Sequence, residues 1–183
     1  MNINYYTQPT YLDKMGNFIA YYWYDSKVEP MTGMTKYQVY LVQKSWKVLN
    51  ADPIKGGALI FKRLFIAYPE TKEFFRTIRH VAEDDLATNG QFKAHALNFM
   101  SNFNNFINNL QQPEISAALM NKLGESHAKR KIKEGHFRDL KIVLTGILRD
   151  DLHLDETTVD AWSKTVDFMC KHIFETMIKT GRE

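Results

Sequence analysis

From Thr35 onward, apolar residues recur at steps of three and four positions, the spacing that places side chains on one face of an α-helix. The first such run contains Val39, Val42, Trp46 and Leu49. No stretch alternates apolar and polar residues as a half-buried strand would. No apolar run reaches the roughly 18 residues that a membrane-spanning helix needs. The pattern predicts an all-α chain without a transmembrane segment.

Prolines and capping residues divide this periodic region into separate helices. Pro53 fits the first turn of the second helix with Asp52 as its N-cap, and Pro69 ends that helix near Ala67. Later helices are predicted over about 89–110, 113–128, 135–152 and 155–177. An acidic connection at 83–85 precedes them. We therefore predict about seven or eight helices in one domain, residues 35–180.

Residues 1–34 differ from the rest of the chain. Asn, Tyr and Thr are frequent there, and Gly16 and Gly33 interrupt any helical pattern. The aromatic stretch 18–24 can dock on the helical domain, bind a partner or touch a membrane surface, and docking is the simplest interpretation. We predict an N-terminal extension that is not a secretory signal, since it lacks a basic start and an aliphatic stretch.

Charge and cysteine content exclude several classes of protein. The net charge of +3 is too weak to indicate nucleic-acid binding, and no basic stripe with interleaved aromatic residues is present. Cys170 is the single cysteine, so the chain contains neither an internal disulfide nor a cysteine-rich zinc site. A cytoplasmic location fits this cysteine usage. The oligomeric state stays open.

Two of the six histidines project from apolar helix faces. His95 lies four residues before Phe99, and His127 continues the four-residue steps of Leu119 and Leu123. A single histidine in such a place is usually a hydrogen-bonded core residue. Two of them on neighbouring helices favour a shared ligand. The other four histidines are expected at the surface: His80, His136, His153 and His172.

The chemistry of these two faces narrows the ligand. Neutral imidazole binds iron or copper well, but a bare metal ion would need further polar or anionic ligands, and the faces offer Phe and Leu. A haem supplies four nitrogens itself and needs only one or two protein ligands. It would be held non-covalently, because no Cys-x-x-Cys-His motif is present. The aromatic content of 13% fits either a dense core or a pocket for such a flat ligand, and alone it favours the core.

Several segments together resemble one known family. They are Trp46, the string 61–69 from Phe61 to Pro69, Phe75, the segment Lys93-Ala94-His95-Ala96, the segment 123–128 around His127, and Ala161-Trp162. The spacing of 32 residues between the histidines (127 − 95) agrees with the same pattern. On these residues, 35–178 resemble the globins, especially cytoglobin, neuroglobin and invertebrate single-domain globins.

The resemblance implies a globin fold around haem b (iron protoporphyrin IX) that binds dioxygen, carbon monoxide and nitric oxide. It implies that His127 is the proximal iron ligand and that Phe75 stacks on the haem. It implies one of two roles for His95, a hydrogen bond to bound dioxygen or direct ligation of the iron, and favours the second. The further haem contacts implied are Phe61, Phe99, Leu123, Arg130, Ile132 and Phe137.

The chain also departs from the family pattern. Phe99 stands where an aliphatic residue is usual, and with Phe61 it is expected to crowd the ligand pocket. Asn98 replaces a basic residue, which puts a contact to a haem propionate there in doubt. Gly57 and Ala96 fit a close crossing of two helices, since small residues permit close approach.

We expect dioxygen storage, supply or sensing rather than enzymatic turnover. The alternative is a haem enzyme or redox protein that carries out nitric oxide dioxygenation, nitrite reduction or electron transfer. Turnover would require an external reductase, because the chain has no flavin or nicotinamide domain of its own.

Overall fold

The computed structural model describes residues 27–130 and 132–181. Its elements are β1 (Val28–Glu29), β2 (Met34–Thr35), α2 (Lys36–Leu49), α3 (Pro53–Ala67), α4 (Glu83–Leu86), α5 (Gly90–Asn108), α6 (Pro113–Ala128), α7 (Glu134–Gly146) and α8 (Glu156–Thr180). A 3₁₀ turn, Pro69–Phe74, follows α3, and a π-helical turn, Ile147–Asp151, follows α7. The predicted all-α architecture is confirmed.

Local capping explains where several helices begin. The Thr35 hydroxyl accepts from the Gln38 backbone N at 3.2 Å, and the Gln38 side chain accepts from the Thr35 backbone N at 3.0 Å. Asp52 caps α3 through the Lys55 N–H at 3.1 Å. Asp155 caps α8 in the same way. The starts predicted at Pro53 and after Asp155 are therefore confirmed.

Two short elements differ from the prediction. β1 and β2 form a hairpin around Gly33, whose φ of 67° suits glycine. At its end, Met34 is fully buried, and its sulfur accepts from the Thr165 hydroxyl on α8 at 3.2 Å. The acidic stretch predicted as a connection forms α4, since carboxylates favour a helix N-terminus. The expected docking of residues 18–24 concerns a segment outside the described residues.

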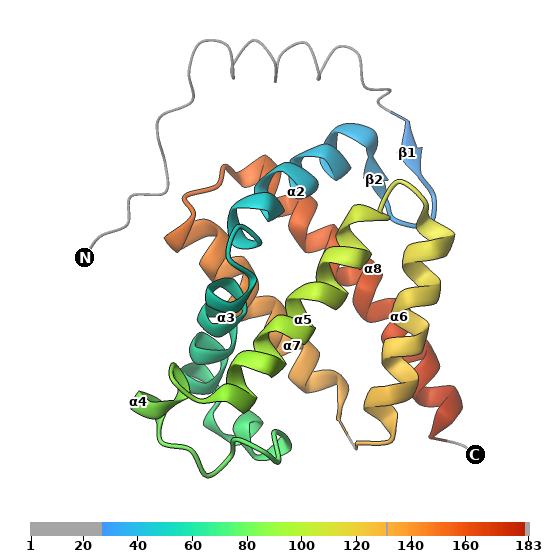
Figure 1. Ribbon diagram of the computed structural model, residues 1–183. Coiled ribbons are helices and arrows are strands. Elements are labelled where there is room, and N and C mark those ends of the chain that lie inside the picture. Colours follow the sequence, from blue (N-terminus) through green and yellow to red (C-terminus); the bar gives the residue numbers. More distant parts are fainter. Residues whose placement is uncertain (1–26, 131, 182–183) are drawn as a thin grey trace.

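Figure 1 shows α5 crossing α3 on one side of the molecule, with α6 and α8 together on the other. At the α3–α5 crossing, a Cβ built on Gly57 would lie 2.7 Å from the Ala96 carbonyl oxygen. A Cβ on Gly124 would lie 2.7 Å from the Ile173 carbonyl oxygen of α8. The close crossing predicted from Gly57 and Ala96 is therefore present, and it fixes the position of the helix that carries His95.

The core ties α2, α5 and α8 together through two buried tryptophans. The Trp162 indole N–H donates to the Ser45 hydroxyl at 2.8 Å, and the Trp46 indole N–H donates to the Asn104 side-chain oxygen at 3.0 Å. Both indoles are almost completely buried, so these bonds satisfy donors that would otherwise be stranded in the core. The candidate site lies on α3, α5, α6 and α7, next to this part of the core.

Candidate functional site

His127 is held in a defined orientation on α6. Its Nδ1 lies 2.9 Å from the Leu123 carbonyl oxygen and 3.2 Å from the Ser126 hydroxyl. Because a carbonyl can only accept, Nδ1 carries the proton and Nε2 keeps its lone pair for a metal. Burial lowers the pKa of His127, and the positive charge of Arg130 lowers it further. The ring is thus held in an orientation in which Nε2 could bind a metal.

His95 lies on α5, where aromatic rings surround it. Its ring centroid is 4.8 Å from that of Phe61 and 4.8 Å from that of Phe75. Burial lowers the pKa of His95, and the charges of His127 and Arg130 add to the effect. The helices α5 and α6 pack against each other, and each carries one half-buried imidazole whose pKa is lowered by burial.

Phenylalanine rings crowd the side of this region next to His95. Phe61 meets Phe75 at 5.4 Å and Phe99 at 5.0 Å between ring centroids, both edge to face. Phe99 in turn stacks on Phe103 at 5.4 Å. Phe61 is buried, whereas Phe75 and Phe99 are half-buried. The rings leave little free space beside His95.

The other side of the region comes from α6 and the start of α7. Leu123 and Ile132 are half-buried against the core, and Phe137 is buried with its ring centroid 5.4 Å from that of His127. Arg130 is exposed, and its guanidinium donates to the Ser126 carbonyl oxygen at 2.5 Å. The structure thus gathers the apolar residues singled out from the sequence around the histidines, while Arg130 lies at their outer edge.

Phe65 and two histidines lie in surroundings that were not predicted from the sequence. Phe65 is fully packed, and its centroid is 5.0 Å from that of Phe75. Its place one helical turn after Phe61 would have revealed it. His136 and His172, expected at the surface, are half-buried against Phe rings, at 4.5 Å from Phe74 and 4.9 Å from Phe168. The expected exposure of the remaining pair, His80 and His153, is confirmed.

Within the described ranges, no group of three or more His, Cys, Asp or Glu side chains could hold a metal ion. The same part of the chain contains no helix long and apolar enough to cross a membrane. Two neutral imidazoles among phenylalanines can therefore serve an iron or copper whose other ligands come with a larger group.

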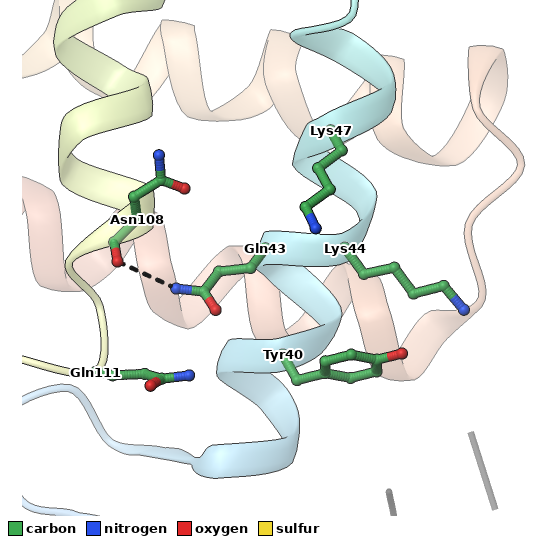
Figure 2. Close-up of a pocket in the computed structure, with 6 residues that line it drawn as sticks. All are labelled: Tyr40, Gln43, Lys44, Lys47, Asn108 and Gln111. Atoms are coloured by element: carbon green, nitrogen blue, oxygen red, sulfur yellow. Dashed lines mark hydrogen bonds between the residues drawn. The ribbon is translucent and has the colours of Figure 1, made fainter. Parts of the chain in front are cut away.

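A polar pocket lies elsewhere, between α2 and the end of α5 (Figure 2). It is lined by Tyr40, Gln43, Lys44, Lys47, Asn108 and Gln111. The Gln43 side-chain N–H donates to the carbonyl oxygens of Ile107 at 3.0 Å and Asn108 at 3.5 Å. These carbonyls lie in the last turn of α5, where the Ile107 oxygen also accepts from the Leu110 backbone N at 3.3 Å. Gln43 therefore joins two helices here, and none of the candidate ligands lines this pocket.

Comparison with known proteins places this geometry in context. The Globin family model matches residues 58–173. Hemoglobin-3 of Phacoides pectinatus is 28% identical, over 76% of this chain and 92% of its own length. Cytoglobin-1 of Oryzias latipes is 23% identical, over 79% of this chain and 85% of its own.

Solved structures agree with these sequence matches. The hexa-coordinate hemoglobin of Drosophila melanogaster superposes with a TM-score of 0.73 at 30% identity, covering 77% of this chain and 94% of that one. A hexacoordinated heme protein from an anhydrobiotic tardigrade gives a TM-score of 0.73 at 19% identity, covering 85% and 99%. The second match shows a shared fold.

Proposed function

This chain belongs to the globin family, and from that premise we propose that it holds one haem b between His95 and His127 and binds diatomic ligands at the iron. The observation that carries the proposal is the pair of neutral, half-buried imidazoles on α5 and α6 inside a cage of phenylalanines. Structural and redox metal sites without a macrocycle would need more ligands than this pair supplies.

The side chains present fit a haem. The porphyrin supplies four nitrogens to the iron, so one or two histidines complete the coordination. Phe75 and Phe137 offer flat apolar contact, and Leu123 and Ile132 offer aliphatic contact. Arg130 supplies a cation at the edge, where the propionates of a haem need a counter-charge. When bound, the haem contributes an iron that accepts dioxygen, carbon monoxide or nitric oxide.

His127 is proposed as the proximal ligand. Its Nδ1 proton is directed to the Leu123 carbonyl oxygen, which fixes the tautomer and makes Nε2 the ligand atom. A ring already held in place loses little conformational freedom when it binds a metal. This explains why His127, rather than His95, should determine how firmly the haem is retained.

His95 is proposed as an internal sixth ligand in the absence of an external one. Its half-buried ring lies among Phe61 and Phe75 on α5, which packs against the helix that carries His127. A relative of known structure at 30% identity is described as hexa-coordinate. An external ligand must then displace His95, so its apparent affinity falls in proportion to the fraction of open sites. This arrangement supports dioxygen sensing, storage or supply, with affinity set by the strength of the His95 bond.

A redox or enzymatic role is the second candidate. The crowding of the His95 side by Phe61 and Phe99 favours its electron-transfer form, because restricted entry slows the exchange of dioxygen but does not impede the transfer of electrons. Nitric oxide dioxygenation and nitrite reduction belong to this candidate. Either reaction would draw electrons from an external reductase.

The visible spectrum of the full chain tests the proposal. The spectrum is recorded in the ferric form and again after reduction with dithionite in the absence of oxygen. Sharp, split bands in the reduced form would support His95 as the sixth ligand, and a His95→Leu variant should convert them to one broad band. A single broad band in the unmodified protein would refute only the proposed role of His95 as sixth ligand and would leave the proposal of a haem protein standing. No haem absorbance after addition of haemin would overturn the whole proposal.

A further inference from the structure

A groove runs along the outer face of α6, beside the candidate site. Its lining residues are Lys122, Glu125, Ser126, Lys129 and Arg130. Steps of three and four residues place the side chains from 122 to 129 on one helix face. All of them except Ser126 are exposed. The groove is thus an open surface feature that a second macromolecule can reach.

Positive charge dominates this groove. Lys122, Lys129 and Arg130 stand against the single carboxylate of Glu125, a net charge of +2 (3 − 1). The ion pairs formed among the described residues all use other side chains. Lys122 and Lys129, which form no ion pair among the described residues and have no role in holding the proposed haem, attract an acidic surface and steer its approach. The chemistry of the groove therefore fits an acidic partner.

The groove is coupled to His127 through one residue. The Ser126 hydroxyl lies in the groove and 3.2 Å from Nδ1 of the His127 ring. Arg130 lines the groove as well, and its guanidinium donates to the backbone carbonyl oxygen of Ser126, the residue before His127. A partner seated here lies directly behind the ring that is proposed to hold the iron.

We propose that this groove is the docking site for the acidic face of a one-electron carrier protein. The inference rests on the proposed function, since the carrier would give one electron to the iron held by His127. The carrier would lose one electron and a bound ferric haem would gain it, with no covalent bond formed or broken. An open groove suits a protein surface better than a small anion, because sites for small molecules enclose most of their ligand.

The test compares two charge-reversal variants of the full haem-loaded chain. Lys122→Glu with Lys129→Glu changes the groove, and Lys36→Glu with Lys47→Glu makes the same charge change on exposed residues of α2. The probe is a plant-type ferredoxin, a small acidic electron carrier. Binding of the oxidised, dye-labelled ferredoxin is followed by fluorescence anisotropy at low salt. Reduction of the ferric protein by reduced ferredoxin is followed in the absence of oxygen.

We expect the groove variant to lose about tenfold or more in both binding and reduction rate, and the α2 variant less than about twofold. Equal losses in the two variants, no loss in either, or no binding to the unmodified protein would overturn the docking site. If a charge reversal impairs folding, double variants with glutamine in place of lysine at the same positions replace it in the test. Haem absorbance is read separately and distinguishes the two proposals. If the protein shows no haem absorbance, the proposed function fails. If it shows haem absorbance but the groove variant is unaffected, only the docking site is refuted.

Discussion

The two candidate iron ligands differ in what holds their rings. Hydrogen bonds to Leu123 and Ser126 fix His127, whereas His95 is held by ring contacts with Phe61 and Phe75. A ring fixed by hydrogen bonds is already oriented for a metal. A ring held by packing alone can leave the iron when another ligand arrives. Under the proposed function, this asymmetry predicts that His127 determines how firmly the haem is retained and that His95 controls access to the sixth position.

His127→Ala should therefore release haem much faster than His95→Ala. Removing even an outer hydrogen-bond partner of a metal-binding histidine lowers metal affinity about 10–100-fold, and loss of the ligand itself should exceed this. The measurement is the rate of haem transfer to an excess of a colourless haem acceptor. Equal rates for the two variants would contradict the assignment of His127 as the proximal ligand.

Phe99→Val should open the crowded side of the site. The Phe99 ring lies 5.0 Å from that of Phe61 and 5.4 Å from that of Phe103, so its removal frees space next to His95. We expect faster carbon monoxide rebinding after flash photolysis and a loss of about 1–2 kcal/mol in the free energy of unfolding. The control is Phe106→Leu, at a buried residue on the same helix whose ring contacts Phe103 and Phe168. That variant should lose stability without a change in rebinding.

The reactivity of Cys170 measures how well the native fold protects this part of α8 from solvent. Burial raises the pKa of its thiol to about 11, and the negative charge of Asp167 contributes. At pH 8 about one thiol in a thousand is therefore ionised, and the thiolate is the reactive form. Iodoacetamide should alkylate native protein at pH 8 far more slowly than protein unfolded in urea, as measured by mass spectrometry. Similar rates in both states would show that this part of α8 is open in the native protein.

At the scale of whole elements, the sequence was sufficient wherever a helix end depends on neighbouring residues. The starts of α3 and α8 are examples. The side chains of Asp52 and Asp155 each accept a hydrogen bond from the backbone N–H three residues later in the chain. The β1–β2 hairpin could not be predicted in the same way. Its place depends on the burial of Met34 against Thr165, a contact between residues far apart in the chain. Two paired residues are also too few to show alternation.

The same distinction applies to the candidate site. Helical spacing alone put His95 and His127 on apolar faces, but it could not show that those faces meet. Helical spacing places Phe65 one turn after Phe61, but only the structure shows its contact with Phe75, which lies just after the 3₁₀ turn that follows α3. Arg130 follows α6 directly, and only the structure places its side chain against Ser126 on the outer face. Periodicity therefore identifies candidate residues, while their mutual arrangement requires the packing of helices.

The crossing of α3 and α5 supplies a test of that packing. In Gly57→Ala the new Cβ would lie 2.7 Å from the Ala96 carbonyl oxygen, which belongs to the residue after His95. Overpacking of this kind costs about 1–3 kcal/mol, measured by urea unfolding, and the helix shift should also alter the reduced haem spectrum. Gly135→Ala, where the Cβ meets nothing within 4 Å, is the control. Equal stability of the two variants would mean that the helices do not cross as closely as described.

For the whole molecule, the question is where the folded domain begins. The sequence divides the chain at 34/35, yet Met34 is buried in the core and Thr35 caps α2. Val28 pairs with Thr35 in the hairpin, so the described residues before α2 are part of the same packed unit. The domain proposed from the structure therefore starts at the hairpin, a few residues earlier than the sequence pattern indicates.

Two truncations separate these boundaries. A chain starting at residue 27 keeps the hairpin, whereas a chain starting at residue 36 loses the Thr35 cap and the buried Met34 side chain. The shorter chain should lose about 3 kcal/mol or more in the free energy of unfolding, the combined effect of a lost cap and a large core side chain. The chain starting at 27 should keep its haem absorbance unchanged, because every candidate ligand lies beyond Thr35. Loss of haem from that chain would show that residues 1–26 contribute to the site, and equal stability of the two truncations would return the domain boundary to 34/35.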